Sequence, residues 1–221
     1  MNLLSTTYFG PVQWYQKLNS VDGVLIEACE NYTKQTYRNR CVIATANGPQ
    51  ALTVPVERPD GIDLNRCPIR DLRISDHGRW RQLHWNALQT AYSESPFFEY
   101  YADDLHPFFN RRYDFLFDFN MEICSVVCSL LDVRPSIALT NEYVKHDLLA
   151  EGTVDYRDSI VPKRPLPDPV FTPKPYYQVF ASKTGFLPNL SVLDLLFNMG
   201  PEGVFWLEEI KKPIISQHHE K

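Results

Sequence analysis

The sequence lacks the short motifs that identify familiar enzyme classes. It contains no phosphate-binding Gly-x-x-x-x-Gly-Lys loop, no Gly-x-Gly-x-x-Gly fingerprint, no Gly-x-Ser-x-Gly elbow and no His-Glu-x-x-His zinc motif. The six histidines and five cysteines show no zinc-ligand spacing. A familiar hydrolase or dehydrogenase is therefore not indicated.

The chain also lacks features of exported, membrane-spanning or nucleic-acid-binding proteins. Its cysteines are odd in number and form no Cys-x-x-Cys pair, which indicates free thiols in a reducing compartment. The N-terminus has no basic and apolar leader, and no apolar run approaches the length of a bilayer span. We therefore expect a cytoplasmic protein with no membrane span. A net charge of −5 excludes general nucleic-acid binding, although a small anionic ligand remains compatible with it.

The composition is that of an ordinary globular protein. Hydrophobic residues make up 44% and charged residues 22% of the 221 residues, so a core can form without metals or disulfides. We expect one domain over residues 1–221, with a polar tail over 212–221 that could be disordered. Six of the 17 prolines lie in Val161–Pro175. This segment, within a region of about residues 157–175, is expected to be an extended arm or a flexible linker.

Hydrophobic periodicity predicts an α/β fold. A strand, a short helix and a second strand near the N-terminus indicate a βαβ-like opening. Asn47-Gly48 suits a hairpin turn between the two strands that follow. The expected class is an open mixed sheet with flanking helices, a β-hairpin and a proline-rich extended arm. The predicted strands are Leu3–Phe9, Val24–Ala28, Arg40–Thr45, Gln50–Val56, Tyr176–Ala181 and Val204–Leu207, and the predicted helices are Val12–Leu18, Arg79–Tyr92, about Arg111–Leu131 and Leu190–Met199.

A run of aromatic and basic residues precedes the hairpin. Tyr32, Lys34, Tyr37, Asn39 and Arg40 lie within nine residues. Arginine offers a planar fork to phosphate or carboxylate and lysine offers a point charge, while a tyrosine ring can stack on a sugar or a base. The alternative is that the run is a solvated flank of the hairpin.

Other candidates lie on predicted helices. His84 falls on the apolar face of its helix, where it is either a general base or a satisfied core residue. Asn120 lies on an apolar stripe and needs hydrogen-bond partners, from the backbone or from a ligand. Asn189 and Ser191 suit helix caps, and Ser191-x-x-Asp194 resembles a capping box, although free donors at a helix start also suit an anion.

Four blocks, taken in order, resemble the WbqC-like family. The resemblance covers nearly the whole chain. The blocks are Tyr8–Pro11 with Tyr15; Lys34, Asn39 and Arg40 followed by Asn47-Gly48-Pro49 and Leu52–Val56; Trp80, His84, Tyr92, Pro96 and Phe97; and the segment Gly185–Pro201.

The chain departs from the family pattern at three places. Thr6-Thr7 stand where members often carry His-Gln, so a proton-transfer role for that histidine cannot be carried over. Cys41 replaces an asparagine, and residues 141–175 form a shorter segment with the proline-rich arm. The resemblance implies a role in bacterial O-antigen and related polysaccharide assembly, and a glycine-transferring role has been proposed for some members. It supplies no established catalytic residues.

These observations lead to a transferase hypothesis with two alternatives. The chain would attach an acyl or aminoacyl group to an amino sugar on a nucleotide or lipid carrier, by positioning and charge stabilisation. Ligands of open α/β sheets lie beyond the carboxyl ends of strands, which would place Tyr8–Pro11 at the cleft. The alternatives are a non-catalytic scaffold that binds polysaccharide-pathway proteins, and a nucleotide-dependent ligase.

The hypothesis assigns each candidate a role and leaves the cofactor open, with no metal. Lys34 and Arg40 would hold a phosphate, a tyrosine would stack on a ring, and His84 would take the proton of the attacking amine. The expected ligand is a sugar or nucleotide sugar. The predicted substrate-binding residues are Tyr8, Tyr32, Lys34, Tyr37, Asn39, Arg40, Tyr92, Asn120, Asn189 and Ser191.

Overall fold

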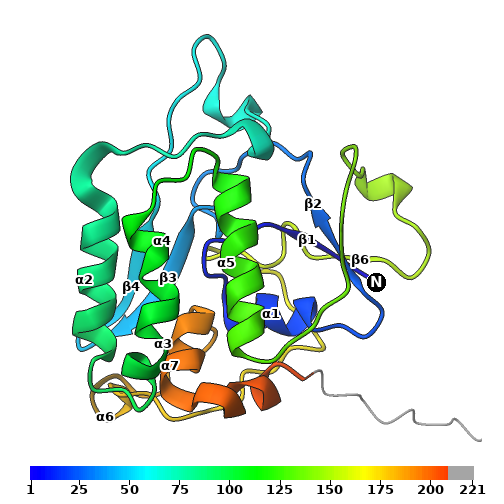
Figure 1. Ribbon diagram of the computed structural model, residues 1–221. Helices are drawn as coiled ribbons and strands as arrows, with labels where there is room; N and C mark the ends of the chain where they lie inside the picture. Colours follow the sequence, from blue (N-terminus) through cyan, green and yellow to red (C-terminus); the bar gives the residue numbers. More distant parts are fainter. Residues whose placement is uncertain (209–221) are drawn as a thin grey trace, which may run out of the picture.

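Four short parallel strands form the central sheet, in the order β5-β2-β1-β6 (Figure 1). The structure is a computed structural model, and it describes residues 1–208. β1 (Asn2–Ser5) pairs with β2 (Val24–Glu27) on one side and with β6 (Val154–Asp155) on the other. β5 (Ile137–Leu139) pairs with β2. All four residues of β1 are buried, as expected for a central strand of a parallel sheet.

The helix α1 (Val12–Leu18) connects β1 to β2 and completes the predicted βαβ opening. Pro11 precedes its first residue, where a missing N–H removes no helical hydrogen bond. All seven residues of α1 are buried. Lys17 forms a 3.0 Å ion pair with Asp168, and the Gln13 carboxamide donates to the same carboxylate at 2.9 Å. The proline-rich arm is therefore attached to α1 by a buried charge pair.

The predicted hairpin forms a separate two-stranded antiparallel sheet of β3 (Arg40–Thr45) and β4 (Gly48–Thr53). The expected sheet was mixed; the structure contains both parallel and antiparallel pairing, but in two separate sheets. Thr45 pairs with Gly48, so Ala46 and Asn47 make the turn. Gly48 has a φ of 102°, a conformation that side-chain-bearing residues rarely adopt.

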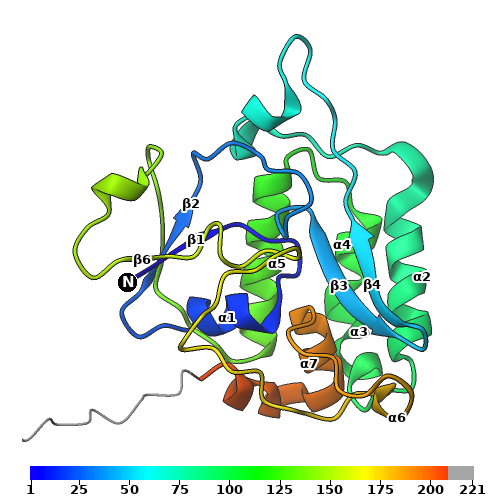
Figure 2. The same cartoon turned by 180° about the vertical axis from the view of Figure 1, so that it is seen from behind.

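The helices α2 (Trp80–Tyr92) and α5 (Leu116–Leu130) confirm the two long helices expected in the middle of the chain. α5 lies between the hairpin and the parallel sheet in both views (Figures 1 and 2). Its buried residues include Asn120, as the stripe predicts. Apolar spacing would also place Leu83 on the buried face of α2, but its side chain is 61% exposed. The chain also forms α3 (Phe98–Leu105), α4 (Pro107–Asn110) and the 3-10 turns Leu64–Arg66, Ile69–Asp71, His77–Arg79 and His146–Leu148.

The C-terminal part confirms one predicted helix and corrects two predicted strands. Residues 161–175 contain no helix or strand, which an extended arm and a flexible linker have in common. Tyr176–Ala181 is not a strand and leads into the short helix α6 (Ala181–Thr184). The buried helix α7 (Val192–Met199) follows, and the predicted strand Val204–Leu207 is instead part of a 3-10 helix. That helix spans Gly200–Trp206. The predicted tail, residues 212–221, lies outside the described residues.

Two further expectations can be compared with the structure. All five cysteines are free thiols in the structure. Within residues 1–208, no helix combines the length and apolarity that crossing a bilayer requires.

Candidate functional site

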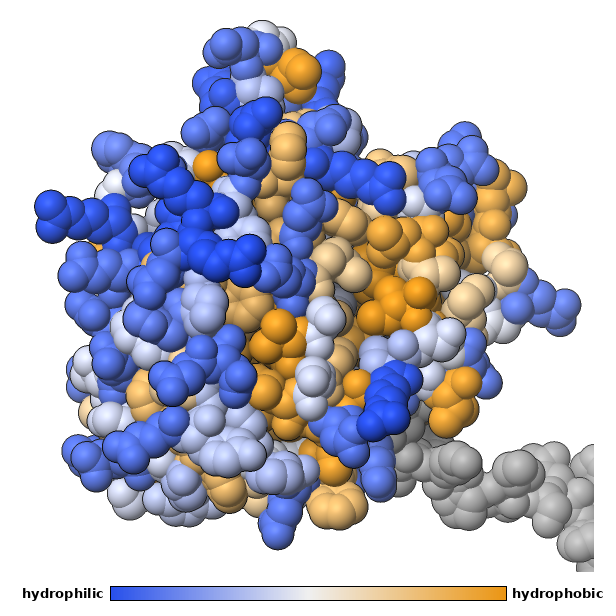
Figure 3. Space-filling model, in the orientation of Figure 1, coloured by the Kyte–Doolittle hydropathy of each residue, from blue (hydrophilic) through white to orange (hydrophobic). Residues whose placement is uncertain are grey.

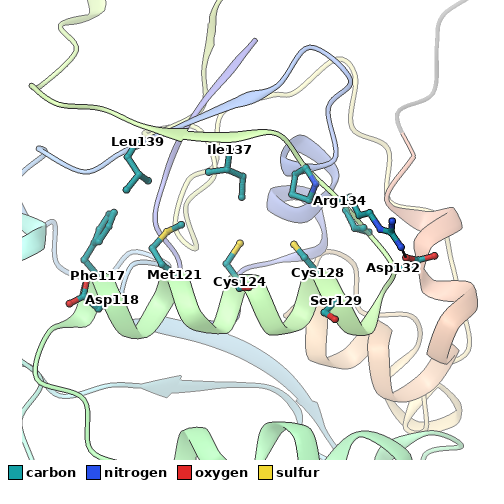
Figure 4. A pocket seen from close by; sticks show the side chains of 13 residues that line it. Phe117, Asp118, Met121, Cys124, Cys128, Ser129, Asp132, Arg134, Ile137 and Leu139 are labelled. Carbon is teal, nitrogen blue, oxygen red and sulfur yellow. Dashed lines mark hydrogen bonds and ion pairs between the residues drawn. The ribbon is translucent and has the colours of Figure 1, made fainter.

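One hollow is a mainly apolar groove between α5 and β5, with a volume of about 680 Å³. Met121, Cys124 and Cys128 project from α5 toward Ile137 and Leu139 of the facing strand (Figure 4). Apolar surface gathers over this region in the space-filling view (Figure 3). The groove is wide open, and its thiols and thioether are surrounded mainly by apolar side chains. Its charged residues lie at opposite ends, Asp118 at one and the ion pair of Asp132 with Arg134 at the other, so they do not converge as catalytic groups do (Figure 4).

A second hollow, here called the polar pocket, brings several ionisable side chains together. It has a volume of about 490 Å³ and lies beyond the carboxyl ends of the parallel strands, where ligands of open α/β sheets bind. Its residues come from the segments that follow β2 and β6 and from the loop after β5. They are Cys29, Glu30, Asn31, Thr33, Arg38, Tyr143, Arg157 and Asp158.

Glu30 and Arg38 form a buried, two-pronged ion pair on one side of the polar pocket. The guanidinium Nε of Arg38 donates to Glu30 Oε1 at 2.8 Å, and its Nη2 donates to Oε2. Nη2 also donates to Ser5 Oγ at 2.7 Å, at the end of β1. Burial raises the pKa of Glu30, and the hydrogen bonds and charge of Arg38 oppose that change without cancelling it.

Glu27, at the end of β2, ties three strand ends together beneath the pocket. It has no exposed surface. Its carboxylate accepts hydrogen bonds from the hydroxyl of Thr140 at 2.6 Å, from the backbone N–H of Val144 at 3.0 Å and from Arg157 Nη1 at 2.9 Å. The backbone N–H of Cys29 donates to it as well, at 2.9 Å. These four donors satisfy the carboxylate, so Glu27 organises the floor of the site.

Arg157, after β6, occupies the other side of the pocket. It donates twice to Asp155, from Nε at 3.0 Å and from Nη2 at 2.6 Å. The Tyr143 ring lies 5.0 Å from its guanidinium carbon. Burial acts to raise the pKa of Asp155, but the hydrogen bonds and charge of Arg157 outweigh it, so the pKa is lowered. Arg157 is thus held rigidly, as a preformed site requires.

In and around the polar pocket, negative side chains outnumber positive ones. The lining itself carries two guanidinium groups, of Arg38 and Arg157, and two carboxylates, of Glu30 and Asp158. Two further carboxylates, of Glu27 and Asp155, lie behind the lining and bind Arg157. His146 contacts Asp155 at 2.9 Å and Asp158 at 3.5 Å and adds a charge only when protonated. The exposed mouth includes Asp158, whose side chain is 70% exposed. With the two carboxylates behind the lining included, the surroundings of the pocket have surplus negative charge, which favours a cationic group over phosphate.

Tyr8 and His84 meet, but in the core. Tyr8 is 0% and His84 6% exposed, and the tyrosine hydroxyl lies 2.9 Å from His84 Nδ1. Burial lowers the pKa of His84 to about 4, against a weaker opposing effect of a backbone hydrogen bond with Thr53. The expectation that Tyr8–Pro11 would line an open cleft is therefore wrong. A catalytic role for His84 stays a prediction, and its surroundings favour a structural one.

The predicted aromatic and basic run divides between core and surface. Tyr32 and Tyr37 are 3% and 9% exposed, which leaves little ring surface for stacking, whereas Lys34 is exposed. Arg40 begins β3 and is half-buried. These residues do not converge on the polar pocket, whose lining takes Thr33 and Arg38 from the same run.

Hydrogen bonds of Asn39 and Asn120 hold the backbone in place at the end of the run 32–40. The Asn39 carboxamide donates to the backbone oxygen of Val54 at 2.8 Å. The Asn120 carboxamide, fully buried on α5, donates to the backbone oxygen of Arg38 at 2.7 Å. The interpretation of Asn120 as a residue bonded to backbone is thus supported by its geometry. Through this bond α5 fixes the backbone of a pocket residue.

The remaining candidate site residues form hydrogen bonds near α7. Ser191 Oγ accepts from the N–H of Leu193 at 3.3 Å, which confirms the predicted helix cap. Asn189 pairs with Gln13 at 2.9 and 3.0 Å. The Tyr92 hydroxyl donates to Asp194 at 2.9 Å, and burial raises the pKa of this carboxyl.

Sequence reasoning missed the residues that build the polar pocket. Glu27 is the last residue of β2, and Glu30 follows three residues later. Because the sequence predicts this strand, a search for polar residues near its carboxyl end would have found both. Arg157 gave no comparable signal, because β6 contains only two residues.

The fold and the pocket define an α/β protein with a preformed polar site at the end of a parallel sheet. Comparison with known proteins identifies the particular family: the chain belongs to the WbqC-like protein family, whose model matches residues 6–158. This range contains every residue of the polar pocket. The chain is also similar to Uncharacterized protein Rv1507c of Mycobacterium tuberculosis (strain ATCC 25618 / H37Rv), with 28% identity over 217 residues, covering 88% of this chain and 91% of that protein. No solved structure gives a significant match.

Proposed function

We propose that the protein is a cytoplasmic transferase of bacterial surface-polysaccharide synthesis that moves an acyl or aminoacyl group, such as glycyl, onto the amine of an amino sugar. The sugar would be attached to a nucleotide or lipid carrier. The observation that carries this proposal is the polar pocket at the carboxyl ends of the parallel strands, with two further carboxylates behind its lining. The polysaccharide context comes from the family resemblance.

The charge balance of the pocket supports an amine as the bound group. When Glu27 and Asp155 behind the lining are counted, carboxylates outnumber guanidinium groups by two, and both arginines already bind carboxylates. A protonated amine would therefore meet a favourable field, strengthened near Glu30, which is buried. Phosphates of a carrier would stay outside the pocket, where Lys34 is exposed.

Glu30 is the candidate proton acceptor. It lines the pocket, and its raised pKa brings it closer to neutrality than an ordinary carboxylate. The ammonium group would give one proton to Glu30, and the neutral nitrogen would attack the acyl carbon of an ester or thioester donor. The bond from that carbon to the donor oxygen or sulfur breaks, and the second nitrogen proton goes to the leaving group. The products are an amide and a free alcohol or thiol.

Binding of three sugars tests the proposal. Glucosamine, N-acetylglucosamine and glucose differ at one position, and only the first carries a charged amine at neutral pH. We expect thermal stabilisation by glucosamine alone, amounting to about 2.7 kcal/mol at 100 times its dissociation constant. The exposed Asp158 permits a variant that should fold normally, Asp158→Asn, which should weaken this binding. Asp103→Asn, on the exposed face of α3, is the matched control and should leave binding unchanged.

Equal stabilisation by all three sugars, or none with glucosamine up to saturating concentrations, would contradict the proposal. Transfer itself is measured by mass spectrometry, as amide formation between glucosamine and an acyl thioester. A non-catalytic binding protein would show the same amine selectivity without amide formation. A nucleotide-dependent ligase would instead be stabilised by nucleotides alone.

A further inference from the structure

A third hollow differs from the polar pocket in both place and chemistry. It has a volume of about 410 Å³ and lies between the turn of the β3–β4 hairpin and α2, and Phe180 forms part of its wall. It shares no residue with the polar pocket. In Figures 1 and 2 the hairpin turn lies at the end of the molecule where α6 is found. We call this hollow the amide groove.

No residue that lines the amide groove carries a charge. Three carboxamides line it from facing elements, Asn47 and Gln50 from the hairpin and Asn86 from α2. All three residues are exposed. Across residues 1–208, none of these carboxamides hydrogen-bonds to another protein group. Each one therefore offers both a donor and an acceptor to a ligand.

The apolar part of the groove is small and flat. Ala87 and the buried Ala91 contribute methyl groups from α2, and the half-buried Phe180 contributes a ring. A ligand that fits must therefore present an apolar face together with groups that both donate and accept hydrogen bonds.

The groove is rigid, because hydrogen bonds fix both walls. The Tyr92 hydroxyl accepts from the backbone N–H of Ala44 at 3.1 Å and so ties α2 to β3. The Thr45 hydroxyl closes the turn by donating to the Gly48 carbonyl at 2.8 Å, and it accepts from the N–H of Asn47 at 3.2 Å. Walls that are already ordered lose little entropy when a ligand binds.

We propose that the amide groove is a binding site for a neutral saccharide. Sugar hydroxyls donate and accept at once, as carboxamides do, and the C–H face of a sugar ring packs against an aromatic ring. A charged ligand would find no counter-charge here, and a purely apolar ligand would leave the carboxamides without partners. The site is independent of the amine-binding proposal, because it requires neither an amine nor any residue of the polar pocket.

Nuclear magnetic resonance of the full chain tests this site directly. The probes are N,N′-diacetylchitobiose, maltose and the anionic digalacturonate at equal concentrations. We expect at least one neutral disaccharide to shift the side-chain amide signals of Gln50 and Asn86, and digalacturonate to leave them in place. Asn86→Ala should weaken that binding by about tenfold, a typical effect of losing a pair of hydrogen bonds. Asn65→Ala removes an exposed carboxamide elsewhere and should have no effect.

The proposal is overturned if neither neutral disaccharide moves these signals, if digalacturonate moves them equally, or if Asn86→Ala binds as the unaltered chain does. Shifts confined to Cys29 and Asn31 would also overturn it, because they would place the sugar in the polar pocket. Failure of the amine proposal leaves these results unchanged, since none of the probes carries a free amine.

Discussion

Acidification should destabilise the fold through a single buried imidazole, that of His84. Its Nδ1 lies 2.9 Å from the Tyr8 hydroxyl inside an aromatic cluster, where burial lowers the pKa from 6.5 to about 4. In the unfolded chain the same ring returns to its ordinary pKa. The unfolded state therefore binds a proton more readily than the folded state, and lowering the pH favours unfolding.

The structure gives the size of this effect. A difference of roughly 2.5 pKa units corresponds to about 3 kcal/mol of unfolding free energy. Because the folded pKa is lowered, the stabilisation is fully present above pH 6.5 and is lost as the pH falls toward 4. At about pH 5 the expected loss is roughly 2 kcal/mol.

Urea unfolding at pH 7.5 and at pH 5, followed by circular dichroism, measures the loss. His84→Gln removes the titrating ring, so the variant should lose about 2 kcal/mol less between these pH values than the unaltered chain. His77→Gln, at an exposed position, serves as the control and should behave like the unaltered chain. If the unaltered chain and His84→Gln lose equal free energy, the ring titrates normally and its structural role is refuted. A catalytic base at this position would then regain support, because its pKa would lie near neutrality.

Three stability predictions follow from packing, each measured by urea unfolding. Asp194→Ala leaves several buried donors without an acceptor and should cost about 3 kcal/mol; a loss below about 1 kcal/mol would contradict the contacts around α7. Leu88→Ala, at a fully buried position of α2, should cost about 2–5 kcal/mol, whereas Leu83→Ala should cost under about 1 kcal/mol, and similar losses would refute the assigned helix face. Gly200→Ala should cost about 1 kcal/mol or more, since φ is 57° and the new Cβ would lie 2.6 Å from the Phe97 ring; unchanged stability would contradict that close approach.

Local sequence signals predicted the elements that depend on local interactions. The bounds of α1 and β3 match the prediction, because each follows directly from apolar periodicity and from a proline or an Asn-Gly turn. The Ser191 cap was predictable for the same reason. The segment Tyr176–Ala181 contains β-forming residues, yet no strand forms there. Gln178 instead uses its side chain to bond Asp194 and Leu187.

The candidate site was predictable only in part. It depends on the ends of strands that are far apart in the chain, and β5 and β6 are too short to give a periodic pattern. The contact of Glu27 with Arg157 joins residues separated by 130 positions. No local pattern contains such a pairing, so the polar pocket appears only when the tertiary structure brings those ends together. The resemblance to a family could identify the chain without locating this pocket.

The short outer strands of the parallel sheet have a consequence for self-association. β6 spans two residues and β5 spans three, so either margin offers only a few backbone groups to a strand from another molecule. Strand addition between copies needs a longer, flatter template, and brief edges are a known protection against it. The parallel sheet should therefore contribute little to edge-to-edge growth between copies of this protein.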